Sequence, residues 1–218
     1  MIPLQFALRR RMMGAGGGGA PISELPLGAL INVGTDGGAG TPHYEIADKD
    51  NLVSGGVVLV RKNIYSKSEF GSNTNYPNGT LDNLIKTTIY NEMPQKLRDK
   101  MMNVTFTLSG SGDITRKMFA LTYTMVGFGN TSGVAEGKAL QLYTSDASRV
   151  KTFNGSRTSW WLSSRYNSDY VWNVYTRGFP NYNAPSSTLH GVVPAFVIPS
   201  KTLYDLTPNT DGSYNLIL

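Results

Sequence analysis

The chain has 218 residues and a mass of 23.7 kDa, which is enough for one domain with a sizeable core and too little for two. Charged residues make up only 16% and cysteine is absent, which excludes disulfide scaffolds, thiolate metal sites and cysteine nucleophiles. The formal charge is +5, and no run of about 18 apolar residues could cross a bilayer as a helix.

The first twenty residues differ from the rest of the chain. They contain no acidic residue and end in a nearly pure glycine segment, which is typical of a flexible tether. Their positive charges follow the apolar run, the reverse of a secretory signal peptide. We therefore predict an arm at 1–20 and a domain at 21–218, with a frayed tail as the alternative for the arm. The anchoring residues of the arm would be Leu8, Arg9, Arg10 and Arg11.

Short strands are predicted along most of the domain. Turn signals rich in Gly, Asn and Asp recur every ten to fifteen residues, and apolar or alternating runs lie between them. The remaining lysines and arginines are scattered among acids, so we expect no nucleic-acid binding. The predicted strands are 29–33, 43–47, 57–61, 104–108, 119–125 and 192–198.

One region favours helix. Leu81, Leu84, Ile85 and Ile89 recur at helical spacing behind Thr80, a good N-cap, and this pattern predicts a helix over 81–92. Pro94 opens a second, shorter helix. Strands together with two inserted helices predict an α+β domain with long loops.

Residues 153–183 hold nine of the 23 aromatic residues, including all three tryptophans. The pair Trp160 and Trp161 is expected in the core. The residues that follow combine aromatic rings with short amides and hydroxyls, which is typical of recognition surfaces, although a tyrosine-rich hairpin is the plainer alternative. The candidate ligand-binding residues are Tyr166, Asn167, Asp169, Tyr170, Trp172, Asn173, Tyr175, Arg177, Asn181, Tyr182 and Asn183.

No catalytic, metal or cofactor site is predicted. His43 and His190 share no spacing that suggests a metal site, and neither a nucleophile elbow nor a phosphate-binding loop is present. The acidic residues near Asp48 favour a turn over a calcium loop. For glycan hydrolysis, Glu136 with Asp169 is the one carboxylate pair to test. We expect that the protein is not an enzyme.

A series of short motifs follows in order along most of the domain. They are Leu-Pro-x-Gly at 25–28, Ala-Asp-Lys at 47–49, Met-Pro at 93–94, Arg-Lys-Met-Phe-Ala-Leu at 116–121, Ala-Glu-Gly at 135–137, Ser-Asp-Ala-Ser-Arg at 145–149, Trp-Trp-Leu at 160–162 and Gly-Val-Val-Pro-Ala-Phe-Val at 191–197. This set resembles a family of uncharacterised domains from phages and prophages of Gram-positive bacteria. The arm also resembles the start of many small virion proteins.

The resemblance implies a C-type-lectin-like fold related to the formylglycine-generating enzyme, with late loops that form a binding face. The cysteine chemistry of the enzyme relatives is excluded here, and the calcium-binding loop of lectins is missing. The resemblance therefore implies a virion protein that displays a binding domain for host attachment, as a tail adhesin or fibre tip. The alternative is a head-fibre, decoration or tail-assembly protein whose aromatic face packs on other subunits.

The expected partners follow from that hypothesis. They are other virion proteins through the arm and a host cell-surface glycan or protein through the aromatic segment. We expect no membrane insertion and a homo-oligomer, with a trimer favoured.

Overall fold

The computed structural model describes residues 18–186 and 189–218, so the predicted anchor from Leu8 to Arg11 lies outside the described residues. The strands are β1 (Ala20–Pro21), β2 (Leu30–Asn32), β3 (His43–Lys49), β4 (Gly56–Arg61), β5 (Lys67–Ser68), β6 (Val104–Leu108), β7 (Gly112–Arg116), β8 (Met118–Ala120), β9 (Thr152–Phe153), β10 (Ser156–Arg157), β11 (Trp160–Arg165), β12 (Val171–Val174), β13 (Pro180–Asn183), β14 (His190–Gly191), β15 (Pro194–Pro199), β16 (Leu203–Tyr204) and β17 (Tyr214–Ile217). The helical elements are η1 (Ile22–Glu24), α2 (Thr80–Asn83), η2 (Leu84–Ile89), α3 (Tyr90–Glu92), α4 (Gln95–Lys100) and α5 (Asp146–Arg149).

The expected α+β class with a C-type-lectin-like fold is wrong. Strands make up 34% of the structure and helices 13%, so the chain is mostly β. The helical periodicity near the middle of the chain is real, but it covers two short segments. The short strand patterns on either side, which are separated by glycine-rich turns, cover far more of the chain and determine the fold class.

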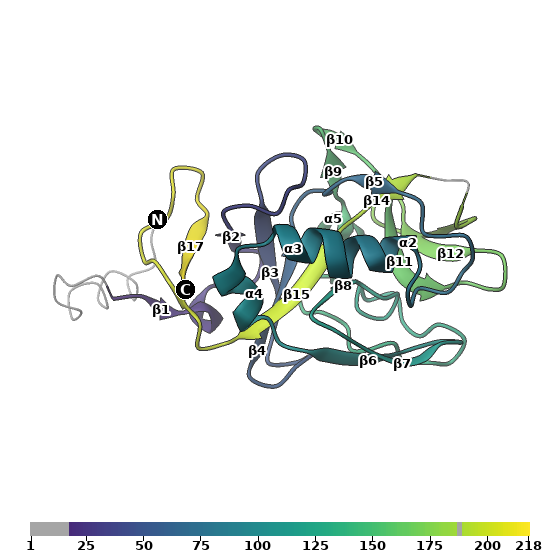
Figure 1. The fold of residues 1–218 in the computed structure, drawn as a ribbon, viewed down its shortest axis with the longest axis horizontal. Coiled ribbons are helices and arrows are strands. Elements are labelled where there is room, and N and C mark those ends of the chain that lie inside the picture. Colours follow the sequence, from purple (N-terminus) through teal and green to yellow (C-terminus); the bar gives the residue numbers. More distant parts are fainter. Residues whose placement is uncertain (1–17, 187–188) are drawn as a thin grey trace.

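The larger sheet has eight strands in the order β1-β16-β17-β2-β3-β4-β15-β8 (Figure 1). Its centre is formed by β3, β4 and β15, which pair antiparallel. All six residues of β4 are buried, as are the first five of β15. The predicted central strand at 192–198 is confirmed from Pro194 onward, since β15 pairs with both β4 and β8. Pro194 takes the first position of β15, where a residue without an N–H is tolerated.

A second sheet has five strands in the order β13-β12-β11-β14-β5. Trp160 and Trp161 are adjacent on β11 and their side chains are 0% and 1% exposed, so the prediction that they lie in the core is confirmed. Their indole N–H groups donate to the carbonyl oxygens of Arg149 at 3.0 Å and Ser68 at 2.8 Å. Two hairpins, β6–β7 and β9–β10, complete the β structure.

The predicted helix over 81–92 is confirmed as the continuous segment α2, η2 and α3. Its middle turn is π-helical, and Leu81, Ile85 and Ile89 are buried. The N-cap is Gly79, one residue before the expected Thr80, and no side chain caps it. In the first turn, the Leu81 N–H donates to the Phe70 carbonyl at 2.9 Å, and the Asp82 carboxylate accepts the N–H of Asn78, which precedes the helix, at 2.8 Å.

The predicted strand over 119–125 is wrong beyond its first residues. β8 ends at Ala120, and 121–127 forms turns in which Leu121 and Met125 are buried while Tyr123 is partly exposed. The alternating apolar residues Leu121 and Met125 are therefore buried although their segment forms no β-ladder. The Ser163 N–H of β11 donates to the Leu121 carbonyl at 2.9 Å, so the segment still joins the second sheet.

Buried ion pairs hold several strands in place. Arg61 is 0% exposed, and its Nε lies 2.5 Å from Oδ2 of Asp36. The Lys151 ammonium, also buried, lies 2.5 Å from the Glu45 carboxylate. Because each charge has its partner, these groups avoid the cost of an isolated buried charge.

The two ends of the molecule differ in content. Figure 1 shows β1 and β17 at one end of the long axis and β12 at the other. The described chain therefore begins next to β1, far from the β11–β13 region. Among the residues that the structure describes, no helix is long and apolar enough to cross a membrane.

Candidate functional site

Six aromatic side chains form one continuous surface row at the β12 end of the molecule. Each ring contacts the next with centroids 4.2–5.4 Å apart, and Tyr166 and Tyr182 stack at 4.2 Å with an interplanar angle of 11°. We call this set the aromatic row. In order along the contacts, its members are Phe128, Tyr123, Trp172, Tyr166, Tyr182 and Tyr170.

Strand alternation places the centre of the row on one face of the second sheet. Trp172 of β12 lies directly opposite Tyr182 of β13 in the antiparallel ladder. Residues opposite each other on neighbouring strands project to the same side. Tyr166 and Tyr170 come from the turn between β11 and β12, which the Tyr166 N–H closes by donating to the Tyr170 carbonyl at 3.0 Å.

The rings of the row are open to solvent on part of their surface. Tyr166, Tyr170 and Tyr182 are 37%, 40% and 43% exposed. None of their hydroxyls hydrogen-bonds to another described residue. The Trp172 indole N–H is buried and has no acceptor within the described part of the chain. The row thus offers ring faces and free hydroxyl groups to a ligand.

The opposite face of the same two strands carries amides. Asn173 is 0% exposed and its Nδ2 donates to Oδ1 of Asn183 at 2.9 Å. The same oxygen accepts from Asn181 at 3.1 Å and contacts the His190 Nε2 at 2.9 Å. We call these four residues the amide cluster. Because their polar groups bind one another, they connect β12, β13 and β14 instead of facing a ligand.

His190 belongs to this buried side of the sheet. Its ring lies 4.5 Å from that of Trp161, and desolvation together with the nearby Lys67 lowers its pKa to about 4. The imidazole is therefore neutral at physiological pH. With three groups around one oxygen of Asn183, the Nε2 of His190 acts as the donor.

The structure separates the predicted binding residues into three groups. Tyr166, Tyr170, Trp172 and Tyr182 form the aromatic row, whereas Asn173, Asn181 and Asn183 face away from it in the amide cluster. Asn167 has a turn role, since its Oδ1 accepts the N–H groups of Asp169 and Tyr170 at 2.9 Å each. The prediction that Asn173 contacts a ligand is wrong, because its side chain is 0% exposed and bound to Asn181 and Asn183.

The remaining predicted residues lie in or beside exposed turns. Tyr175 and Phe179 form their own pair with ring centroids 4.9 Å apart, and they are 40% and 39% exposed. Arg177 lies in the hairpin between them and is exposed, as is Asp169 in the other turn. Gly178 has a φ of +92°, and a Cβ there would lie 1.8 Å from the Asp146 carbonyl oxygen, so only glycine fits.

Two members of the aromatic row, Tyr123 and Phe128, escaped the sequence analysis. Tyr123 was assigned to a half-buried strand, and both lie about 25–30 residues before the aromatic segment at 153–183. The one local signal was an aromatic pair flanking glycine in a turn-rich stretch. Only the docking of this turn on β12 brings them together with Trp172.

Glu136 is buried and hydrogen-bonded within the protein, so its carboxylate is not available to a substrate. Its side chain is 0% exposed; Oε1 accepts the Ser109 N–H at 2.7 Å and Oε2 accepts the Ser164 hydroxyl. Burial raises the pKa of this carboxyl group. The Ser164 oxygen in turn accepts the Tyr123 N–H at 2.7 Å, so Glu136 fixes the turn that carries Tyr123. Asp169, its proposed catalytic partner, is exposed in a separate turn.

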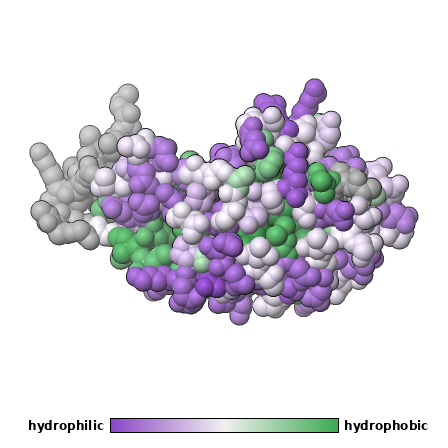
Figure 2. Space-filling view, turned by 45° about the horizontal axis from the view of Figure 1, so that its top comes forward, coloured by the Kyte–Doolittle hydropathy of each residue, from purple (hydrophilic) through white to green (hydrophobic). Residues whose placement is uncertain are grey.

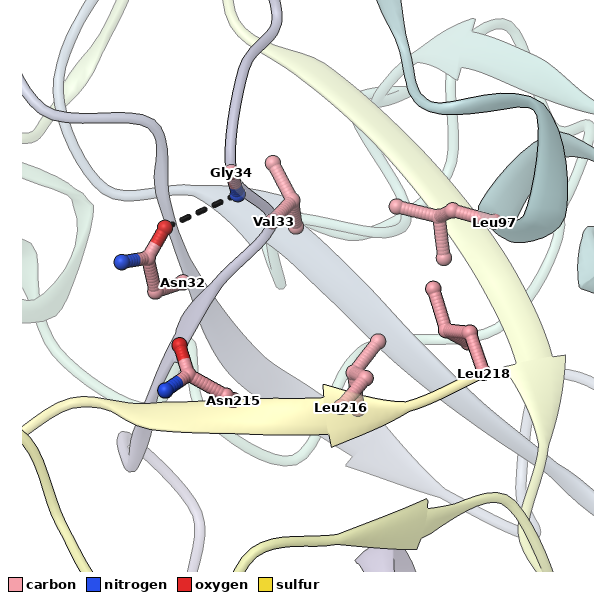
Figure 3. Close-up of a pocket in the computed structure, with 7 residues that line it drawn as sticks. All are labelled: Asn32, Val33, Gly34, Leu97, Asn215, Leu216 and Leu218. Carbon is pink, nitrogen blue, oxygen red and sulfur yellow. Dashed lines mark hydrogen bonds between the residues drawn. The ribbon is translucent and has the colours of Figure 1, made fainter.

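A pocket of about 200 Å³ lies elsewhere, between α4 and the strands β2 and β17 (Figure 3). Leu97, Leu216 and Leu218 project into it, and Asn32 and Asn215 line the other side. Both amides already bind the protein, Asn32 through Gly34 at 2.9 Å and Asn215 through Asn209 at 3.0 Å. None of the described residues that line the pocket has a titratable side chain.

Charged and apolar groups elsewhere do not form a further site. Within 18–186 and 189–218, no group of three or more His, Asp or Glu residues could hold a metal ion. Asp48 and Asp50 accept hydrogen bonds from the Leu52 and Gly55 N–H groups, as the predicted turn requires. Leu203 and Ile217 are exposed partners across β16 and β17, and Figure 2 shows an apolar patch at this end of the molecule.

By fold and surface, the chain is a mostly β domain that exposes a row of aromatic side chains. It belongs to the family described as "Domain of unknown function (DUF6273)", whose model matches residues 54–200. That range includes the whole aromatic row and the amide cluster. Neither a curated protein nor a solved structure matches the chain. The family description names no fold, ligand or source, so the resemblance to phage domains stays a prediction.

Proposed function

We propose that this protein is a binding protein of a phage virion and that the aromatic row contacts the surface of the host cell. The observation that carries the proposal is the exposure of three contacting tyrosines, Tyr166, Tyr170 and Tyr182, whose hydroxyls form no hydrogen bond with another described residue. Tyrosine offers a large contact area for little loss of side-chain entropy, and its hydroxyl orients a ligand.

The arrangement of the chain supports this role. Residue 18, where the described structure begins, adjoins β1 at one end of the long axis, whereas the row lies near β12 at the other (Figure 1). An arm that binds other virion proteins would therefore hold the domain with its aromatic end outward. One such surface binds weakly, and many copies on a particle, as trimers or as separate subunits, would supply avidity.

The proposal is tested with the full chain displayed in many copies on fluorescent beads. Beads that carry the wild type should bind intact cells of at least one strain in a panel of Gram-positive bacteria, measured by flow cytometry. The variant Tyr166→Ala/Tyr182→Ala removes the stacked pair and should reduce the bound fraction about tenfold or more.

A matched control is available on the same hairpin. Tyr175→Ala/Phe179→Ala removes two rings of nearly the same exposure that do not belong to the row, and it should bind as the wild type does. Equal binding by both variants would show that the row is not the contact surface. If folded protein binds no strain, the structural role is favoured, in which the aromatic row packs on neighbouring virion subunits.

A further inference from the structure

The aromatic row is an extended surface that turns at Tyr166, because Trp172 and Tyr182 both contact Tyr166 and lie 6.0 Å from each other. Its six rings come from three segments, 123–128, 166–172 and Tyr182, and follow one another without a gap at centroid distances of 5.4 Å or less. The pocket described above lies in a different part of the fold. A ligand that uses the whole row must therefore be long and lie along the surface.

The charges beside the row favour a neutral ligand. In the sequence, Arg165 precedes Tyr166 and Asp169 precedes Tyr170, so the charged residues next to these tyrosines have opposite signs. At the other end, the Arg149 guanidinium lies 4.5 Å from the Phe128 ring centroid but binds Asp146 at 3.0 Å and the carbonyl oxygens of Val126 and Tyr143. A single-stranded nucleic acid would also stack on aromatic rings, but its phosphates require a basic groove. Among the described residues, Arg149 is the one lysine or arginine whose charge lies over a ring of the row.

We propose that the row binds a neutral polysaccharide chain, whose sugar rings pack on the solvent-exposed surfaces of Tyr166, Tyr170 and Tyr182. This inference rests on the proposed function and names the class of its ligand. The C–H faces of sugar rings are apolar and match the exposed faces of Tyr166, Tyr182 and Tyr170. Sugar hydroxyl groups would bind the tyrosine hydroxyls, which have no described protein partner.

The structure also supplies a spectroscopic reporter. Trp160 and Trp161 are buried, while Trp172 is only partly buried and contacts three rings of the row. A chain bound on the row changes the surroundings of Trp172 alone. Its binding should therefore change the intrinsic tryptophan fluorescence of the full chain.

The first test uses cells of a strain that the wild-type beads bind. One sample is treated with protease, which removes surface proteins, and another with periodate, which opens sugar rings that carry neighbouring hydroxyl groups. We expect binding to survive protease and to fall about tenfold or more after periodate. Loss after protease with retention after periodate would overturn the polysaccharide and indicate a protein ligand.

The second test uses wall polysaccharide from the same strain, hydrolysed and sorted by length. Affinity, measured by tryptophan fluorescence, should rise about tenfold or more from disaccharide to hexasaccharide, because longer chains cover more rings. It should change little between 50 and 500 mM salt, since a neutral chain releases no counterions. Affinity that does not depend on length, or that falls steeply with salt, would overturn the neutral chain along the row.

The variant pairs separate this inference from the proposed function. Tyr166→Ala/Tyr182→Ala should lose the hexasaccharide, and Tyr175→Ala/Phe179→Ala should retain it. Cell binding that depends on the row without any response to the wall saccharides would overturn the polysaccharide and leave the proposed function standing. Absence of cell binding in every strain would overturn both.

Discussion

The two faces of the β12–β13 hairpin have the same backbone and opposite chemistry. On one face, Trp172 and Tyr182 belong to the partly exposed aromatic row. On the other, Asn173 and Asn181 are tied to Asn183 and His190 over Trp161. Neighbouring residues on one strand therefore belong to different surfaces. One surface is open to a ligand, whereas the polar groups of the other are hydrogen-bonded within the protein. Substitutions on the amide face should reduce stability, whereas substitutions on the aromatic face should reduce binding.

The largest loss of stability is expected for a substitution of Trp161, whose ring contacts His190 of the amide cluster. Trp161→Ala removes a buried indole that contacts Phe70 and His190 and donates to the Ser68 carbonyl. Loss of a buried tryptophan costs about 3–5 kcal/mol of unfolding free energy. Urea denaturation followed by circular dichroism measures it, and a loss below about 1 kcal/mol would contradict the burial of this side chain.

The amide cluster itself should contribute less. Asn173→Ala deletes the donor to Asn183 and the acceptor of Asn181. Leaving buried polar groups without partners costs about 1–3 kcal/mol. The same denaturation measurement applies, and bead binding should be unchanged at a temperature where the variant is folded. A variant of wild-type stability that no longer binds would instead make Asn173 part of the binding surface.

The pH dependence of stability should reveal His190. Its pKa is about 4 in the folded protein and 6.5 in an unfolded chain, so between these values the unfolded state binds the extra proton. Stability contributed by neutral His190 is present above pH 6.5 and is lost as the pH falls to about 4. Because the ring is partly exposed, we expect a loss of about 1–2 kcal/mol.

The control for that loss is His190→Gln, which does not titrate. The free energy of unfolding is measured for both proteins at pH 7 and pH 4.5, so that contributions from the acidic residues cancel. The wild type should lose more stability than the variant. Equal losses would mean that the folded protein binds a proton at His190 as readily as the unfolded chain.

The smallest effect on stability is expected on the aromatic face. Tyr166→Ala/Tyr182→Ala removes partly exposed rings, and contacts of this kind are worth about 1 kcal/mol. Thermal unfolding should therefore change by only a few degrees while cell binding falls. A loss as large as that of Trp161→Ala would mean that the stacked pair belongs to the core, and the binding proposal would fail with it.

Local patterns predicted a substantial part of this molecule. The helical spacing of Leu81, Ile85 and Ile89 was sufficient to place a helix, because the residues of one helical face are close in sequence. The concentration of rings near Trp160 indicated the region of interest. The same segment also held an unused signal, since Tyr170 and Trp172 alternate with Val171 and Asn173 as the two faces of a strand do.

Other features depend on contacts between distant segments. The mostly β class was missed because two clear helical patterns suggested more helix than the chain has. Tyr123 and Phe128 join the row only through the packing of their turn on β12, which Glu136 and Ser164 support. The sequence holds no local pattern for such a contact.

By itself, the sequence determined the composition of the site: rings, short amides and few charges in one late segment without cysteine. Only the tertiary structure decided which of these residues face solvent. Side-chain alternation is local, but the covering of each face depends on which strands and turns pack against it. Here the amides hydrogen-bond to one another and to the His190 side chain on one face, and the opposite face remains partly exposed as the aromatic row.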